Sequence, residues 1–259
     1  MKYTKYIVIL FIILCIISYI PYNTPKGYIL ETFWSPDDNH TRGQQAMTDM
    51  FRKFNGICRK HNIKYWCIGG TLIGALRHKG WIPFDADMDI CMLEEDYAKL
   101  QSIIQDELKD TRYMFQDKTV DTNYTPNIGK IRFLDAIYFN YKDNKVSHHG
   151  LQIDIFVVTN KNGIIKGTKR NGAGHRDRLH LLGAEEKFSS IEYDMIFPLK
   201  ELKFEDIDVY VPNQYKEYSK KAWGDYPPPM LPKEQQNPHE GPITFIIPDW
   251  IKTMYPKYY

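Results

Sequence analysis

The sequence predicts an α/β (α+β) domain preceded by a single N-terminal transmembrane helix. Three observations support this prediction: an uncharged apolar run near the N-terminus, amphipathic helical segments between short strand-like segments, and a Gly-Gly break after the first strand-like run. A chain of 259 residues can bury a sizeable core. The formal net charge of +2 gives no argument for nucleic acid as a partner.

The N-terminal segment predicts a signal anchor at residues 6–22, after a cytoplasmic tail at residues 1–5. Its length only just reaches the lower limit of ~17 residues for a spanning helix, which suits a thin endomembrane bilayer. A cleaved signal peptide is the main alternative, but no small-x-small cleavage site follows the apolar run.

The flanking charges predict the orientation of this anchor. Lys2 and Lys5 precede it and only Lys26 follows shortly after, which places the N-terminus in the cytoplasm. We therefore expect a single-pass type II membrane protein of the Golgi or endoplasmic reticulum, with its catalytic domain in the lumen. Residues 23–44 would form a stem and residues 45–259 the domain, and glycosylation sequons begin at Asn39 and Asn123.

The domain is expected to begin with an amphipathic helix from Gln45 to His61, because its apolar residues recur at spacings of three and four. A short strand over 65–68 should follow and break at Gly69-Gly70. Thr71 can then cap a brief helix that runs to His78.

Asp85, Asp87 and Asp89 alternate with apolar residues, so an extended strand would present all three carboxylates on one face. Such carboxylates repel one another unless a cation lies among them, and hard oxygen ligands suit Mg²⁺ or Mn²⁺. A solvated edge strand and a calcium loop are the alternatives. The calcium loop is excluded, because its required glycine and glutamate positions hold Ile90 and Asp96.

Further elements follow from periodicity and turn residues. The pattern predicts a helix over 94–109, strands over 113–115, 129–133, 136–141, 150–158 and 207–211, and a helix from Pro212-Asn213 that ends at the Trp223–Tyr226 turn. The four cysteines show no metal-binding spacing: Cys15 lies in the expected anchor, and Cys67 and Cys91, which could be neighbours across the sheet, are interpreted as buried free thiols.

Polar groups on two of these strands are candidates for the same site. Asp154 is the one charge in a buried strand, so it must be paired with a cation, hydrogen-bonded or bound to metal. Lys130 and Arg132 share one strand face, which can be an ordinary exposed face or a phosphate contact. The cationic segment 161–178 is either a solvated loop or a cover for an anionic donor.

The stretch GGTLIGALRHKGWIPFDADMDI, residues 69–90, resembles the signature of the LicD/fukutin family of phosphotransferases, and the K-I-R segment at 130–132 and the segment 198–229 resemble later parts of that family. The resemblance implies a nucleotidyltransferase-like mixed sheet flanked by helices. It also implies paired aspartates on a strand after the Gly-Gly turn and a third acidic residue on a neighbouring strand, for which Asp154 is the candidate.

The resulting functional expectation is a metal-dependent transferase. Asp87, Asp89 and Asp154 would hold Mg²⁺ or Mn²⁺, and Asp85 or Asp154 would accept the proton of an acceptor hydroxyl. Donor phosphates would contact Gly69, Gly70, Thr71, Arg77, His78, Lys130 and Arg132.

The family resemblance implies a CDP-alcohol or sugar nucleotide as donor. It also implies transfer of phosphocholine, ribitol phosphate or mannose phosphate onto a glycan or glycoconjugate. A D-x-D glycosyltransferase that uses a sugar nucleotide and a non-catalytic lumenal binding protein are the alternatives.

Overall fold

The computed structural model describes residues 38–124, 128–138, 148–167, 191–229 and 241–259. The expected tail and anchor at 1–22, much of the expected stem, the last residues of the strand expected over 136–141, and residues 168–178 of the cationic segment lie outside these ranges. Within the described ranges, no helix combines the length and the apolar character that crossing a membrane requires.

The first described element is the long helix α3, Asp38–Lys60. It starts at Asp38 rather than at Gln45, so the end of the expected stem is part of the domain. Its apolar face is buried as the spacing predicted, through Met47, Met50, Phe51, Phe54 and Ile57.

The main sheet is mixed and has the order β1-β2-β5-β4-β10. These strands are β1 (Trp66–Cys67), β2 (Met88–Leu93), β5 (Gly150–Lys161), β4 (Gly129–Tyr138) and β10 (Ile243–Thr244). β2 and β5 are parallel, whereas β1, β4 and β10 each pair antiparallel with their neighbours. This arrangement confirms the expected mixed α/β fold.

Three more strands extend the sheet at its sides. β3 (Tyr113–Gln116) pairs with β4, β6 (Ile164–Gly167) with β5, and β7 (Ile191–Glu192) with β6. A separate hairpin consists of β8 (Lys200–Phe204) and β9 (Ile207–Val211). The two strands expected over 129–133 and 136–141 form the single strand β4, whose register against β5 shifts between Arg132 and Ile137.

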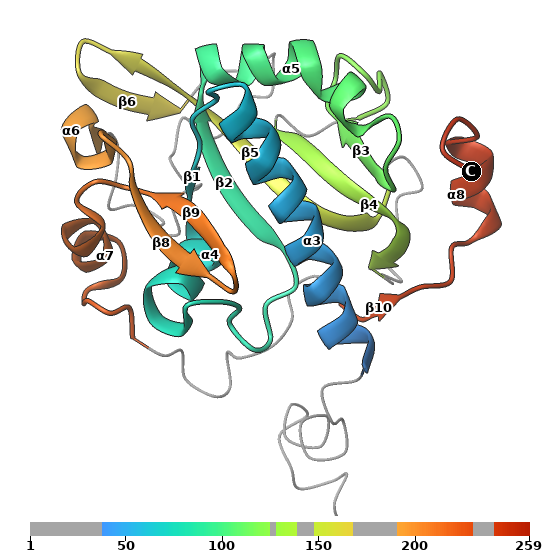
Figure 1. Ribbon diagram of the computed structural model, residues 1–259, viewed down its shortest axis with the longest axis horizontal. Helices are drawn as coiled ribbons and strands as arrows, with labels where there is room; N and C mark the ends of the chain where they lie inside the picture. The colour runs from blue at the N-terminus through green and yellow to red at the C-terminus, as the bar shows by residue number, and fades with distance from the viewer. Residues whose placement is uncertain (1–37, 125–127, 139–147, 168–190, 230–240) are drawn as a thin grey trace, which may run out of the picture.

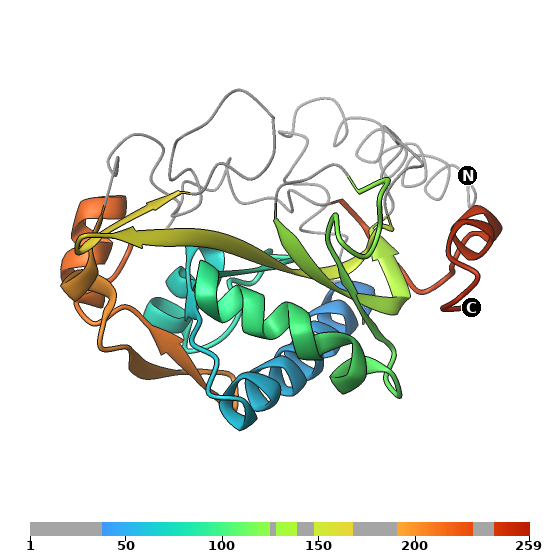
Figure 2. The same cartoon turned by 90° about the horizontal axis from the view of Figure 1, so that it is seen from above.

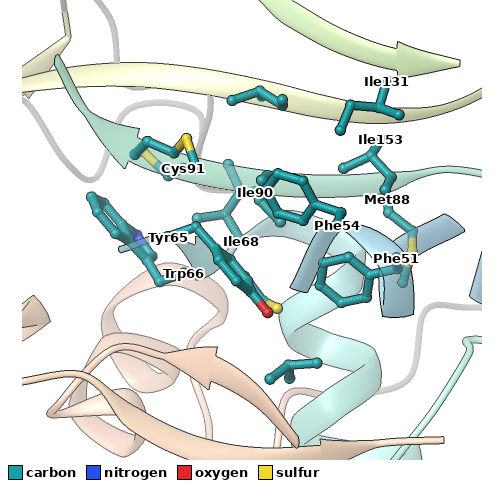
Figure 3. Packing of buried hydrophobic residues seen from close by; sticks show 14 of the residues in the cluster. Phe51, Phe54, Tyr65, Trp66, Ile68, Met88, Ile90, Cys91, Ile131 and Ile153 are labelled. Carbon is teal, nitrogen blue, oxygen red and sulfur yellow. The ribbon is translucent and has the colours of Figure 1, made fainter. Parts of the chain in front are cut away.

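Helices α3 and α5 (Glu94–Leu108) lie on the same face of the sheet (Figures 1 and 2). The core between them and the sheet contains Phe51 and Phe54 from α3 against Ile90, Ile131 and Ile153 from three neighbouring strands (Figure 3). The other helices are α4 (Gly69–Ile73), the π-helix η1 (Gly74–His78), α6 (Tyr193–Ile196), α7 (Tyr215–Trp223) and α8 (Asp249–Met254).

The acidic segment departs from the sequence prediction in one respect. β2 begins at Met88, so Asp89 lies on the strand while Asp85 and Asp87 belong to the irregular segment before it. The prediction of one strand carrying all three was therefore wrong. Alternation of polar and apolar residues predicts alternating burial, which this segment has, but it does not supply a hydrogen-bonding partner strand.

Candidate metal centre

Three carboxylates from two adjacent strands and one loop converge at the candidate site. Asp89 on β2 and Asp154 on β5 are direct partners in the parallel pair, so their side chains leave the same face of the sheet. Asp87 joins them from the segment before β2, and one carboxylate oxygen from each residue lies within 4.8 Å of the others. Asp154 is buried and the other two are half-buried.

Lys130 extends this row across the next strand. It is the register partner of Asp154 in the antiparallel β4–β5 pair, and its Nζ forms a buried ion pair with Asp154 Oδ1. Lys130 Nζ also donates to Gln152 Oε1 at 2.8 Å. The sequence required a partner for the carboxylate of Asp154, and Lys130 is that partner.

Arg132 lies two positions after Lys130 on the same face of β4 and is almost completely buried, at 5% exposure. Its Nη1 donates to Gln152 Oε1 at 2.7 Å and to the Gly150 carbonyl at 3.0 Å, and its Nε donates to Gln116 Oε1 at 3.1 Å. Burial lowers the pKa of the Arg132 guanidinium. Arg132 and Lys130 thus share one acceptor, the side-chain oxygen of Gln152.

Gly69 and Gly70 allow two of the aspartates to approach the start of α4. Gly69 has a φ of +52°, and a Cβ there would lie 2.8 Å from Asp89 Oδ2. A Cβ on Gly70 would overlap Asp85 Oδ2. A side chain at either position would therefore displace a carboxylate of the acidic segment.

Thr71 does not cap a helix as predicted. Helix α4 already starts at Gly69, and its N-cap is Ile68, without a side-chain hydrogen bond. Thr71 Oγ1 instead accepts a hydrogen bond of 2.8 Å from the backbone N–H of Asp89. This hydrogen bond joins α4 to the beginning of β2.

Arg77 and His78 lie in the π-helix η1, a rare helix type that often occurs at functional sites. Arg77 Nη1 donates to the carbonyls of Pro229 at 2.6 Å and Pro228 at 3.1 Å. Arg77 Nε donates to His78 Nε2 at 3.0 Å, which requires a neutral imidazole. Consistently, burial and the charge of Arg77 lower the pKa of His78.

The donor set fits a hard divalent cation. Three carboxylates offer oxygen ligands only, the type that Mg²⁺ and Mn²⁺ prefer over the nitrogen and sulfur ligands typical of zinc sites. Lys130 supplies one positive charge beside three negative ones, so the cluster keeps a net negative charge that a cation can neutralise.

Sequence reasoning missed Gln152 and Gln116, which organise the two cations. Gln152 could have been found, because it lies two positions before Asp154 on a predicted strand and must share its face. Gln116 gave no comparable signal, since its role depends on the β3–β4 register.

A family model described as the LicD/FKTN/FKRP nucleotidyltransferase domain matches residues 62–214, which include every carboxylate and cation of this site. The chain belongs to the LicD family.

Several curated proteins are similar to this LicD-family chain. An uncharacterized protein of Rickettsia prowazekii is 30% identical over 190 residues, 70% of this chain and 58% of that protein. The lipopolysaccharide cholinephosphotransferase LicD of Haemophilus influenzae is 36% identical over 78 residues, 30% of this chain and 29% of the enzyme. The human ribitol 5-phosphate transferase FKRP is 24% identical over 221 residues, 81% of this chain and 38% of that protein.

The matched part thus spans little more than half of these relatives at most. The match to the family model confirms the family that the sequence motifs indicated. The family includes proteins named as phosphotransferases.

The comparisons correct the expected localisation. A Golgi or endoplasmic reticulum type II membrane protein was wrong, because proteins of Rickettsia prowazekii and Rickettsia typhi are among the relatives and bacteria have neither compartment. The described residues also contain no helix able to span a membrane, and the apolar segment 6–22 lies outside them.

Proposed function

We propose that this LicD-family chain transfers a substituted phosphate group from a nucleotide-activated donor to a hydroxyl of a glycan or glycoconjugate. The observation that carries the proposal is the row Asp89–Asp154–Lys130 across three adjacent strands, with Asp87 beside it. It combines an oxygen-ligand metal site with a cation next to it, as phosphoryl-type transfer requires. Phosphocholine, ribitol phosphate and mannose phosphate are the candidate groups.

Asp87, Asp89 and Asp154 would hold Mg²⁺ or Mn²⁺. A bound cation of this kind neutralises the oxygens of a donor diphosphate and polarises the phosphorus that is attacked. Because Asp89 and Asp154 are register partners on a buried sheet, their separation is set by the strand spacing rather than by flexible loops.

The two strand cations would have different roles. Lys130 lies directly beside the carboxylate cluster, so its ammonium would contact a phosphate of the donor bound there. Arg132 is buried behind it and would act through the shared acceptor Gln152, holding Lys130 in position. Gly69, Gly70, Thr71, Arg77 and His78 remain predicted donor contacts.

Asp85 is the better candidate for the base. Asp154 is committed to the Lys130 ion pair and to the carboxylate cluster, whereas Asp85 lies outside that cluster and is half-buried next to Gly70. The acceptor oxygen would lose its proton to Asp85 while it forms the new bond to phosphorus. The bond between that phosphorus and the oxygen of the departing nucleoside monophosphate would break.

The leaving nucleotide tests this function directly. The purified chain is incubated with Mn²⁺ and CDP-choline, CDP-ribitol or GDP-mannose, with and without a glycan acceptor, and the released nucleotides are separated. Transfer of a phospho-group releases CMP or GMP, whereas a D-x-D glycosyltransferase would release GDP from GDP-mannose. Release of GDP alone contradicts the proposal, and binding without release of any nucleotide favours a non-catalytic binding protein.

A further inference from the structure

Two of the side chains that hold the acidic segment between Asp85 and Asp89 belong to neither the proposed metal site nor the predicted donor contacts. We infer that Gln44 and Tyr138 are positioning residues, which fix the backbone of this segment so that its carboxylates are arranged for a metal before the metal arrives. The inference rests on the proposed metal site and adds two residues to it.

Gln44 reaches the segment from the first turns of α3. Its Nε2 donates to the carbonyl of Asp85 at 2.9 Å and lies 3.2 and 3.3 Å from the carbonyls of Ile82 and Pro83. His40, one turn earlier on α3, contacts the same Pro83 carbonyl through Nε2 at 3.0 Å. The N-terminal end of α3 therefore holds the chain where it enters the acidic segment.

Tyr138, the last residue of β4, contacts Ala86, the residue that follows Asp85. Its hydroxyl donates to the carbonyl of Ala86, the residue between Asp85 and Asp87, and its side chain is 5% exposed. Thr71 from α4 accepts the N–H of Asp89. Three separate elements thus hold the backbone at positions 85, 86 and 89.

These side-chain contacts take the place of the hydrogen bonds that a neighbouring strand would otherwise provide to the backbone of this segment. Because β2 begins at Met88, the carbonyls of Asp85 and Ala86 lie outside the strand pairing of the sheet. Buried backbone carbonyls need a donor, and Gln44 and Tyr138 provide it.

Repulsion between the aspartates opposes this arrangement in the absence of metal. If a lost contact reduces the metal-competent fraction of the chain to one tenth, the apparent metal affinity falls about tenfold, even though every ligand remains. Positioning by Gln44 and Tyr138 therefore has a measurable signature that differs from loss of a ligand.

The test compares Tyr138→Phe with Tyr65→Phe in the full chain, using Mn²⁺ alone as the probe. Tyr65 is a matched control, because its hydroxyl donates one buried hydrogen bond, 2.8 Å to Asn55 Oδ1 on α3, and not to the backbone of the acidic segment. Both variants lose a buried hydrogen bond and should melt at similarly reduced temperatures. Only Tyr138→Phe should bind Mn²⁺ about tenfold more weakly.

Gln44→Met supplies the second arm. It keeps the shape of a half-buried side chain but removes its donor, and Gln45→Met on the exposed face of α3 is its control. Gln44→Met should weaken Mn²⁺ binding and Gln45→Met should not. This arm decides the question if Tyr138→Phe fails to fold.

The outcomes separate the two proposals. If the wild type binds no Mn²⁺, the metal site itself is absent and both proposals fall. If the wild type binds Mn²⁺ and the folded variants at Gln44 and Tyr138 bind it as tightly as their controls, only the positioning role is overturned.

Discussion

Asp89 and Asp154 are register partners in the only parallel strand pair among the described strands of the main sheet. Their side chains therefore lie next to each other on one face. Parallel neighbours keep equivalent side chains on one face at the spacing of adjacent strands. Two like charges are therefore held together by backbone pairing, and this relationship governs how the site should respond to substitution.

Replacing Asp89 by Asn should separate metal binding from folding. The amide keeps the shape of the carboxylate but removes one charge, so repulsion in the metal-free protein decreases and its melting temperature should be retained or rise. Stabilisation by Mg²⁺ with nucleotide should be largely lost. Thermal melting with and without ligand checks this, and Asp249→Asn on an exposed helix end is the control. Full ligand stabilisation of Asp89→Asn would rule out the site.

Lys130 and Asp154 should show strong coupling in a double-mutant cycle. Lys130→Met leaves a buried carboxylate without its ion-pair partner and should cost about 3 kcal/mol of unfolding free energy. The double variant with Asp154→Asn should be less destabilised than the sum of the singles, by about 1–3 kcal/mol. Urea denaturation with EDTA present measures all four proteins. Additive effects would contradict the pairing.

Gly69→Ala should harm both stability and the metal site. A left-handed backbone at φ +52° costs an alanine about 1–2 kcal/mol, and the new Cβ would press on Asp89 Oδ2. Gly56→Ala on the exposed face of α3 is the matched control, because a Cβ at position 56 would meet nothing within 4 Å. That control should gain about 0.5–1 kcal/mol. Equal effects of both substitutions on unfolding free energy and Mn²⁺ affinity would contradict this account.

His148 should make the protein sensitive to mild acid. Its ring is fully buried, Nδ1 accepts the Gly150 N–H at 2.9 Å, and Nε2 contacts Tyr259 Oη at 2.8 Å. Burial, aided by the charge of Arg132, lowers the pKa of His148 from 6.5 to about 3. The unfolded chain therefore binds the extra proton first as pH falls.

The stability contribution of neutral His148 is complete above about pH 6.5 and declines below it, by about 1.4 kcal/mol per pH unit, until pH approaches the folded-state pKa. Between pH 6.5 and pH 5 this amounts to roughly 2 kcal/mol. Urea denaturation across this range should show a flatter profile for His148→Asn. Tyr259→Phe keeps the imidazole and should keep the wild-type slope, so equal slopes for all three proteins would argue against His148.

Several elements of the fold were predictable because local patterns and burial agree. Helix α5 was expected over 94–109 and spans Glu94–Leu108, with Tyr97, Leu100 and Leu108 buried as the spacing required. The family resemblance implied that the acidic strand and the Asp154 strand are neighbours, and the pairing of β2 with β5 confirms this.

The parts that could not be predicted depend on contacts between distant segments. Gln44 was placed in a stem, because nothing in its local sequence shows that α3 crosses the loop at residues 82–85. The start of β2 was misplaced because the parallel pairing with β5 begins at Met88, a limit set by the partner strand. Arg77 was predicted to contact donor phosphates, but its hydrogen bonds to the backbone carbonyls of residues 228–229 could not be predicted, because they depend on where the chain passes after α7.

The β2–β5 pairing has a kinetic consequence. Asp89 and Asp154 are distant in the sequence, and α5, β3 and β4 lie between them. A cation bound to both would act as a reversible cross-link across a long loop, which can close only after β2 has found β5. Since slow, non-local pairing precedes the cross-link, metal should leave the refolding rate nearly unchanged and slow unfolding instead. The lifetime of the folded domain would then increase as the occupancy of the site rises.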